Sequence, residues 1–131
     1  MKRFFLLTLA SAALLGASAA PVKTYEVKSP DGRLALVLTA GERLSFTVAR
    51  DGETLVAPSE MALTLSTGEV LGESPRVRSA RRRAVTETID APLYRQIRFD
   101  AAYNELDLRL RGDYGILARA YDDGVCYRFY T

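Results

Sequence analysis

The chain has 131 residues, which is enough for one domain of ordinary size and too few for two. Hydrophobic residues make up 48% of the sequence and charged residues 26%, a balance that is typical of a folded globular protein and excludes wholesale disorder. There is no His, no Trp and one Cys, so a Cys/His zinc site, a Ser-His-Asp triad and a Cys-His dyad are excluded.

The first twenty residues have the pattern of a secretory signal peptide. A basic start precedes an apolar run over residues 4–15, and small residues up to Ala20 fit a signal-peptidase site. We expect cleavage after Ala19 or Ala20, which makes residues 21–131 the mature domain and places it in the periplasm or outside the cell. The apolar run is shorter than the roughly 20 residues that span a bilayer, so no membrane span is predicted.

Without the leader, the domain is formally neutral. The whole chain carries 18 basic and 16 acidic residues, and the leader holds two of the basic ones and none of the acidic ones, which leaves 16 of each. The main basic cluster is Arg81-Arg82-Arg83, with Arg76 and Arg78 before it. In a neutral exported domain we interpret this cluster as a solvated strand or loop, and we expect no nucleic-acid partner.

The mature region is patterned as strands throughout. Apolar residues recur at every second position in six runs, over residues 34–38, 44–48, 61–65, 106–110, 116–120 and 125–129. A period of two puts one set of side chains on a buried face and the other set in solvent. Turn residues separate the runs, and Asp51-Gly52 has the sequence of a two-residue hairpin loop. Together these features predict an all-β antiparallel sandwich or barrel of about ten short strands, with residues 72–83 poorly patterned.

The single cysteine and the end of the chain carry two further expectations. Cys126 cannot form an intramolecular disulfide, and among Val125, Tyr127 and Phe129 it is expected to pack as a small hydrophobe rather than to act as a reactive thiol. The apolar strand at 125–130 is followed by one residue. It fits an edge strand or the middle of a larger sheet whose partners are absent, and we favour the second interpretation.

Four segments then follow one another in a distinctive order. They are Ser29-Pro30-Asp31-Gly32-Arg33, the strand and turn from Leu44 to Gly52, Tyr103-Asn104-Glu105-Leu106, and the run from Arg119 to Phe129, which contains Tyr121-Asp122-Asp123-Gly124-Val125. In order and spacing they resemble the N-terminal domain of family 97 glycoside hydrolases, secreted or periplasmic enzymes that cleave α-linked glucosides or galactosides. The resemblance covers residues 25–130.

The resemblance implies part of an antiparallel β-supersandwich of the galactose-mutarotase type. It also implies a carbohydrate-binding module that helps to wall the active-site pocket, with an α-linked saccharide and a (β/α)₈ catalytic barrel as its partners. We expect a chain truncated before that barrel. The catalytic glutamates and calcium-binding carboxylates of the family lie mainly elsewhere and none is carried over here, so calcium is expected only in a full-length member. The motif residues of interest are Ser29, Asp31, Gly32, Asn104, Glu105, Tyr121, Asp122, Asp123 and Gly124.

Two acidic groups are candidates for chemistry. Glu105 and Asp107 share a strand face with Cα atoms about 7 Å apart, which is close to the spacing of glycosidase carboxyl pairs. Because Arg109 and Arg111 continue that face, cross-strand charge pairing on a solvated surface is the favoured interpretation. Asp122-Asp123-Gly124 offers too few oxygens for calcium and is interpreted as a turn whose Asp side chains bind nearby backbone amides. No catalytic residue is assigned.

The aromatic residues leave the saccharide contact open. Seven Tyr and five Phe are expected mostly in the core, with one or two exposed rings available to stack on sugar. The predicted function is a non-catalytic, carbohydrate-binding N-terminal domain of an exported α-glycoside hydrolase. The alternatives are a structural or interaction β-sandwich, or a non-functional gene fragment, without saccharide binding, and an autonomous hydrolase.

Overall fold

The computed structural model describes residues 21–93, 95 and 98–131 of the chain. The signal peptide predicted for residues 1–20 lies outside the described residues. In the part that is described, no helix has the length and apolar character needed to cross a membrane.

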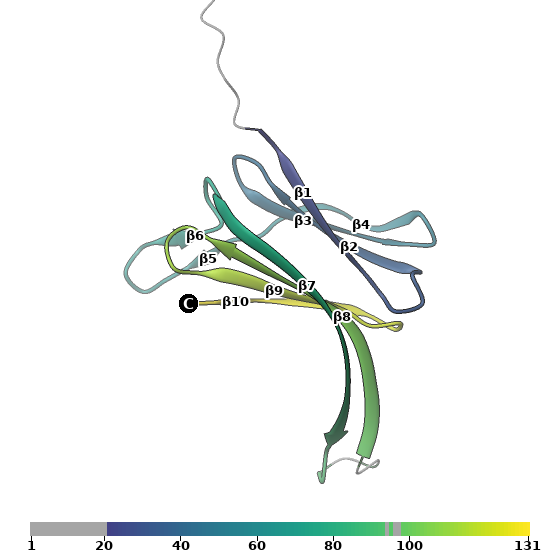
Figure 1. The fold of residues 1–131 in the computed structure, drawn as a ribbon. Helices are drawn as coiled ribbons and strands as arrows, with labels where there is room; N and C mark the ends of the chain where they lie inside the picture. Colours follow the sequence, from purple (N-terminus) through teal and green to yellow (C-terminus); the bar gives the residue numbers. More distant parts are fainter. Residues whose placement is uncertain (1–20, 94, 96–97) are drawn as a thin grey trace, which may run out of the picture.

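Two four-stranded antiparallel sheets face each other as a sandwich (Figure 1). The first sheet has the order β1-β2-β3-β4 and consists of β1 (Lys23–Lys28), β2 (Leu34–Ala40), β3 (Leu44–Arg50) and β4 (Glu53–Glu60). The second has the order β10-β9-β8-β7 and consists of β7 (Val77–Asp90), β8 (Arg98–Leu110), β9 (Gly115–Ala120) and β10 (Val125–Tyr130). A ribbon of β5 (Leu63–Thr64) and β6 (Val70–Leu71) lies beside them. The all-β antiparallel prediction is confirmed.

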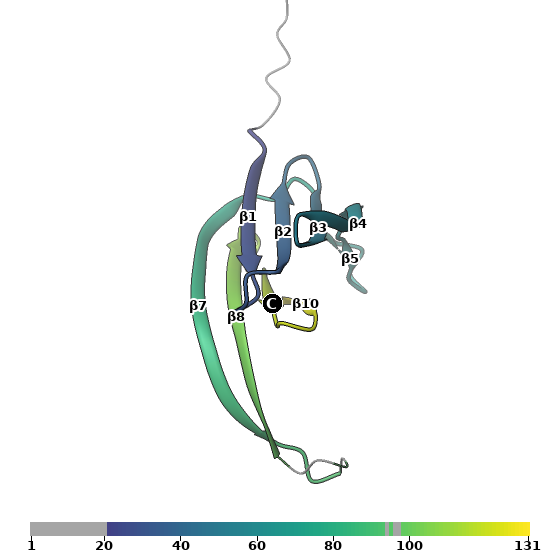
Figure 2. The ribbon, with the colours of Figure 1, turned by 90° about the vertical axis from the view of Figure 1, so that its right-hand side faces the viewer.

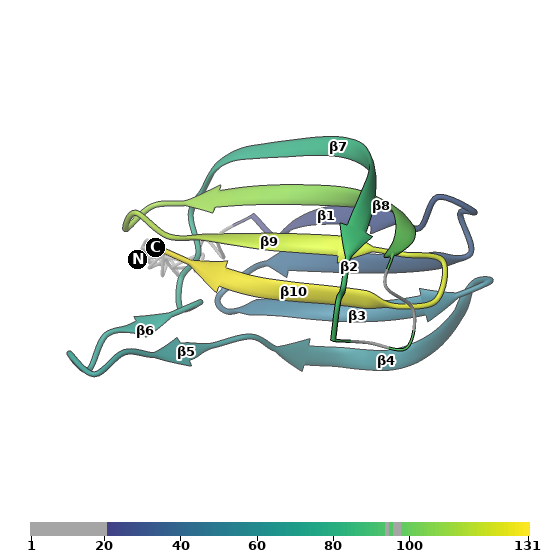
Figure 3. The same cartoon turned by 90° about the horizontal axis from the view of Figure 1, so that it is seen from below.

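The hydrophobic core lies between the two sheets. The strand axes of one sheet are roughly aligned with those of the other (Figure 3). Each central strand contributes every second residue, as the alternation predicts. The leucines of β2 and β8 are fully or almost fully buried, and they are Leu34, Leu36, Leu38, Leu106, Leu108 and Leu110. Ile116, Ala118 and Ala120 of β9 belong to the same core cluster as these leucines, Leu34 excepted.

The predicted hairpin loop is present between β3 and β4. Both of its residues have positive φ, 51° at Asp51 and 84° at Gly52. Two consecutive positive φ angles are the mark of a type I′ turn, whose twist matches that of the flanking strands. Asp tolerates this conformation and Gly adopts it at little cost, which is why the dipeptide predicts the turn.

Three features differ from the expectation of short, evenly alternating strands. The poorly patterned residues 72–83 include the start of β7, which has 14 residues and pairs with the 13 residues of β8. Because β7 is an edge strand, Arg81-Arg82-Arg83 is exposed and shows no alternation, which fits the solvated-strand interpretation. The run at 61–65 contributes only the two-residue β5.

The expectation for Cys126 is wrong. Its neighbours Val125 and Phe129 pack against the core cluster. Because side chains alternate between the two faces of a strand, the Cys126 side chain lies on the opposite face of β10. The thiol is therefore exposed. β10 itself lies at the edge of its sheet in the described structure.

β7 and β8 continue beyond the sandwich as a two-stranded projection (Figures 1 and 2). β9 pairs with β8 only from Asn104 to Arg109, so residues 98–103 of β8 pair with β7 alone. We call residues 85–90 and 98–103 the arm. Its base adjoins the edge of β1, where the candidate site lies.

Candidate functional site

The two motif turns, far apart in sequence, meet in the structure. The backbone N–H of Asp31 donates to the Asp122 carboxylate over 2.9 Å, across a sequence separation of 91 residues. The first turn belongs to the β1–β2 connection and the second to the β9–β10 connection, so this bond joins the two sheets. The Asp122 side chain does bind a backbone amide, but the amide belongs to the other turn rather than to its own.

The first turn is held by its own side chains. Ser29 is buried, and its hydroxyl donates to the Asp31 carboxylate over 2.5 Å while accepting from the Leu34 N–H over 2.9 Å. The hydrogen bonds from Ser29 and from the Arg33 N–H lower the pKa of Asp31. Gly32 closes the turn by donating its N–H to the Ser29 carbonyl over 2.9 Å. The Ser-Pro-Asp-Gly motif is therefore a hydrogen-bonded turn in which the Asp31 carboxylate already accepts hydrogen bonds from Ser29 and the Arg33 N–H.

The second turn contains the other motif residues. The Tyr121 N–H donates to the Gly124 carbonyl over 2.8 Å, which closes the loop, and Asp123 is exposed. Within the described residues there is no group of three or more His, Cys, Asp or Glu side chains that could hold a metal ion. The Asp122 carboxylate accepts from the Asp31 N–H, and the Asp31 carboxylate accepts from Ser29 and the Arg33 N–H, so both carboxylates help to hold the two turns.

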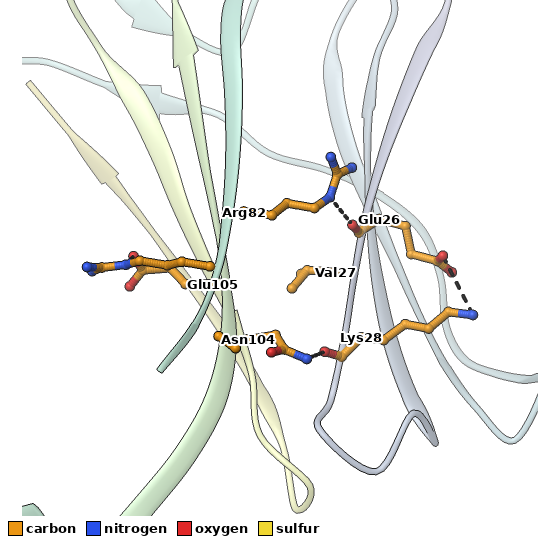
Figure 4. Close-up of a pocket in the computed structure, with 8 residues that line it drawn as sticks. Glu26, Val27, Lys28, Arg82, Asn104 and Glu105 are labelled. Atoms are coloured by element: carbon orange, nitrogen blue, oxygen red, sulfur yellow. Dashed lines mark hydrogen bonds and ion pairs between the residues drawn. The ribbon is translucent and has the colours of Figure 1, made fainter. Parts of the chain in front are cut away.

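Asn104 and Arg82 join the second sheet to the edge strand β1 (Figure 4). The Asn104 amide donates to the Lys28 carbonyl over 2.8 Å, and the Arg82 Nε donates to the Glu26 carbonyl over 3.0 Å. These carbonyls are two residues apart, so they point in the same direction along β1. The side chains thus satisfy backbone groups that an edge strand otherwise leaves open to other strands.

A cleft of about 260 Å³ lies between β1 and the base of the arm. It is lined by Glu26, Val27, Lys28, Arg82, Arg83, Ala84, Asn104 and Glu105. In Figure 4, Arg82 and Asn104 reach across it towards β1, whereas Glu105 points to the other face of the second sheet. Arg82 has N–H donors beyond the one that binds β1, and Asn104 has an acceptor oxygen. The cleft therefore offers N–H donors of Arg82 on one side of the apolar Val27 and the amide oxygen of Asn104, an acceptor, on the other.

Glu105 is the buried centre of an ion-pair cluster whose two arginines extend to the surface. Its side chain is only 3% exposed, and its two oxygens accept from Arg83 Nε over 2.6 Å and from Arg119 Nε over 2.8 Å. The Arg119 guanidinium lies 4.5 Å from the centre of the Tyr103 ring, and that ring is 4.8 Å from the ring of Tyr121. The predicted cross-strand charge pairing is present, because Arg83 and Arg119 are the direct neighbours of Glu105 on β7 and β9.

The expectation that this pairing occurs on a solvated surface is wrong for Glu105. Burial by itself raises the pKa of the Glu105 carboxyl, but the hydrogen bonds from Arg83 and Arg119 outweigh it and hold the pKa below its usual value. Burial and a hydrogen bond to Glu87 raise the pKa of Tyr103. Glu105 is therefore a carboxylate with both oxygens occupied, whereas the acid of a glycosidase pair must hold a proton for the leaving group.

Asp107, the other member of the pair, is also hydrogen-bonded. It is half-buried and accepts from the Tyr130 hydroxyl. Burial and this bond raise the pKa of Tyr130. The Tyr130 ring lies directly over Gly115, its register partner on β9, where a Cβ would come within 2.4 Å of the ring. The face that carries Glu105 and Asp107 is thus a network of paired side chains.

The sequence pattern singles out Asn104 and Glu105 of the cleft but gives no role there to Arg82 or Val27. Arg82 stands in a run of three arginines, and only its pairing with Leu106 shows that it shares the face that looks towards the first sheet. Val27 was part of no singled-out run, although it is 4% exposed. The register between β7 and β8 is the signal that identifies Arg82, and it follows only when β7 is recognised as a long strand.

Comparisons with known proteins match this chain to one family. The model of the family described as glycosyl-hydrolase 97 N-terminal matches residues 27–131. A retaining alpha-galactosidase of Bacteroides thetaiotaomicron is 37% identical over 107 residues, which cover 82% of this chain and 16% of that protein. This chain therefore spans about a sixth of the length of that relative.

Solved structures share the fold. A glycoside hydrolase family 97 enzyme from Pseudoalteromonas sp. strain K8, solved in complex with panose, superposes with a TM-score of 0.72 at 17% identity, covering 80% of this chain and 17% of that one. The same enzyme in complex with acarbose gives the same values. A beta-arabinopyranosidase superposes with a TM-score of 0.66 at 16% identity, covering 80% of this chain and 18% of the other.

Proposed function

This chain belongs to the glycosyl-hydrolase 97 N-terminal family, and from that premise we propose that it is the non-catalytic, saccharide-contacting domain of an exported α-glycoside hydrolase. In this proposal it packs on a (β/α)₈ catalytic barrel and forms part of the wall of the saccharide site. The names of the relatives support an α-linked substrate, since one is an alpha-galactosidase and another was solved with panose.

One observation carries the saccharide contact. Arg82 and Asn104 project from the second sheet into the cleft, and each uses one donor to bind a β1 carbonyl. Neighbouring sugar hydroxyls are recognised by donors and acceptors held in fixed positions, and these two side chains are held in that way. Val27 lines the cleft between them but is buried in the core, so the sugar contact rests on the two polar side chains.

The proposal is tested by titrating the chain with panose and, separately, with melibiose, an α-galactoside. We expect the backbone amide NMR signals of Val27, Lys28 and Ala84 to shift, with a Kd on the order of 1 to 10 mM for such an open site. Arg82→Ala should weaken binding about tenfold, the effect of losing one charged hydrogen bond. Arg81→Ala is the matched control, because Arg81 pairs with Asp107 and shares the opposite face of the sheet.

The alternative, a structural or interaction sandwich without saccharide affinity, predicts another result. In that case the Arg82 and Asn104 side chains only hold β1 in place. Arg82→Ala then lowers the unfolding midpoint, and neither sugar shifts any amide signal at about 50 mM, well above the expected Kd. This result from a folded chain contradicts the saccharide proposal.

Export rests on the leader at residues 1–20. A basic start, an apolar run and small residues before Pro21 support cleavage by signal peptidase. N-terminal sequencing of the protein from the periplasmic or culture fraction should begin at Ala20 or Pro21. An intact Met1 in that fraction argues against cleavage.

A further inference from the structure

Charge is divided unevenly between the two sheets, although residues 21–131 as a whole are neutral. Residues 21–73, which include the first sheet and the β5–β6 ribbon, carry 5 basic and 8 acidic side chains, a net charge of −3. Residues 74–131, which include the second sheet, carry 11 basic and 8 acidic side chains, a net charge of +3. All 11 of these basic residues are arginines. This division concentrates positive potential on the second sheet.

Five of these arginines lie on the outer face of the second sheet, which points away from the core. The register of the four strands places them there, because each alternates along its strand with residues that face the first sheet. We call them the arginine face, and they are Arg81, Arg83, Arg109, Arg119 and Arg128. All are exposed except the half-buried Arg119.

Two carboxylates share this outer face with the five arginines, which leaves a net charge of +3. One of them is Glu105, whose two oxygens accept from Arg83 over 2.6 Å and from Arg119 over 2.8 Å. Figure 4 shows Glu105 and Arg82 pointing to opposite sides of the second sheet. The arginine face is therefore separate from the side of the sheet that carries Arg82.

The second carboxylate, Asp107, is also engaged. It accepts from the Tyr130 hydroxyl and lies 3.7 Å from Arg109. Arg81 and Arg128 lie in the same row across the sheet as Asp107, on the two edge strands β7 and β10. Neither of these two arginines forms an ion pair within the described residues. The face thus presents two exposed guanidinium groups whose charge nothing in the described structure neutralises.

The kind of group that fits these guanidiniums is visible on the face itself. Arg83 and Arg119 each hold a carboxylate oxygen of Glu105. A guanidinium presents planar N–H donors that match a carboxylate in geometry as well as in charge. Carboxylates from outside the chain are therefore the natural ligands for Arg81 and Arg128.

The dimensions of the face indicate an extended ligand. Arg81 and Arg128 are three strand spacings apart, about 14 Å, so one small anion does not bridge them. A chain of acidic sugars carries a carboxylate on each unit and contacts several arginines at once. Contacts between exposed charges are individually weak, and linking them in one ligand raises their combined affinity.

A membrane surface fits the same charge less well. Surface-bound proteins add apolar side chains that enter the lipid to the attraction between charges. Among the described residues interleaved with the arginines, Leu117 and Tyr130 are half-buried and Tyr103 is buried. The face therefore offers charge without an exposed apolar anchor.

We propose that the arginine face binds an acidic polysaccharide through its carboxylate groups. This is a second carbohydrate surface, on the side of the second sheet opposite Arg82 and Asn104, and it goes beyond the contact proposed for the cleft. Its ligand is a polymer of uronic acids, whereas the cleft takes a neutral sugar. Each surface can therefore be tested without the other.

The test measures the binding of a fluorescein-labelled oligogalacturonate to the chain by fluorescence anisotropy. The variant carries Arg81→Ala together with Arg128→Ala. The matched control carries Lys23→Ala together with Arg50→Ala, which removes the same charge from exposed positions of the first sheet. A neutral dextran replaces the oligogalacturonate in a parallel titration, and vesicles of phosphatidylglycerol are tested by co-sedimentation.

We expect a Kd on the order of 100 μM for the oligogalacturonate at about 20 mM salt, weakening as the salt is raised because the contacts are exposed. The double arginine variant should bind about tenfold more weakly, since two exposed charge pairs are lost. The control variant should change the Kd by less than about twofold, and dextran should not bind. Melibiose binding should be the same in all three proteins.

Three results overturn the proposal. The first is equal weakening by the two double variants, which shows attraction to overall charge, and the second is a folded wild type that does not bind oligogalacturonate. The third is binding to the vesicles without binding to oligogalacturonate, which assigns the face to a membrane. Unfolding midpoints verify that the variants are folded, and Arg81→Gln with Arg128→Gln replaces the alanine pair if its midpoint shifts by more than about 1 °C. Oligogalacturonate binding without melibiose binding supports this proposal and counts against the cleft.

Discussion

The two halves of the β7–β8 hairpin form one continuous ladder but obtain their stability in different ways. In the sandwich half, leucines of β8 lie in a core shared with β2 and β9. In the arm, the strands are joined by backbone bonds and by polar cross-strand pairs such as Thr88–Asp100. In this hairpin the backbone pairing sets the length of the strands, whereas the side chains that cover each face set their stability. Substitutions in the two halves should therefore have very different effects.

The largest effect is expected in the sandwich half. Leu106 is 0% exposed, and Leu106→Ala removes buried methyl groups and leaves a cavity, so it should cost about 2 to 5 kcal/mol of unfolding free energy. Urea denaturation measures the loss. The matched substitution in the arm, Phe99→Ala, should cost less than about 1 kcal/mol in the chain alone. Equal losses in the two variants contradict the contrast between the halves.

A smaller effect is expected on the outer face of the sandwich. Gly115→Ala puts a Cβ within 2.4 Å of the Tyr130 ring, which must move and lose its bond to Asp107, at a cost of about 1 to 3 kcal/mol. Tyr130→Phe keeps the ring and removes only the hydroxyl, so it should cost about 1 kcal/mol. Both are measured by urea denaturation. A Gly115→Ala variant no less stable than Tyr130→Phe shows that the ring does not pack on Gly115.

The ion-pair cluster should make stability depend on acid pH. The pKa of Glu105 is lowered in the folded state, because the hydrogen bonds from two arginines outweigh burial, while the pKa of an unfolded Glu is about 4.3. The folded state thus favours the carboxylate, so its contribution is present above about pH 4.3 and is lost as the pH falls through the folded pKa.

Thermal unfolding from pH 7 to pH 3 checks this expectation. The midpoint temperature of unfolding should fall further in acid for the wild type than for Glu105→Gln, and the two curves of midpoint against pH should converge at the lowest pH. Glu53→Gln, on the exposed strand β4, is the control and should follow the wild type throughout. Parallel curves for the wild type and Glu105→Gln would show that the carboxylate is not stabilised by Arg83 and Arg119.

The smallest effect is expected in the arm. Thr88→Val removes an exposed hydrogen bond and keeps the branched side chain, so global stability should change by less than about 0.5 kcal/mol. Hydrogen exchange should nevertheless quicken in the arm amides and not in β9. Thr86→Val, one pair closer to the sandwich on the same face, is the control. A large global loss in Thr88→Val contradicts the independence of the arm.

Much of the sandwich was predictable because its signals are local. Alternating leucines along β2 and β8 and the Asp51-Gly52 loop are readable within a few residues, and the structure has them where the pattern predicts. Periodicity gives the two faces of a strand but does not say what lies over each. For this reason Cys126 was assigned to the core, although Val125 and Phe129 already occupy the core-facing positions of β10.

The candidate site was only half predictable. The motif residues were singled out from their order, and the structure brings several of them together, as in the Asp31–Asp122 bond between the two turns. Arg82 was not found, because its role depends on the register between β7 and β8 and on the position of β1 across the cleft. These relations join residues more than fifty positions apart, and no local pattern contains them.

The sequence by itself determined the class of fold, the strands with one buried face and the family to which the chain belongs, because alternation, turn chemistry and short motifs are local properties. The tertiary structure decided the rest. It buried Glu105 between Arg83 and Arg119, opened a cleft beside β1, and carried the arm past the sandwich. Burial and charge pairing depend on which strands become neighbours, and that is settled only when the two sheets pack on each other.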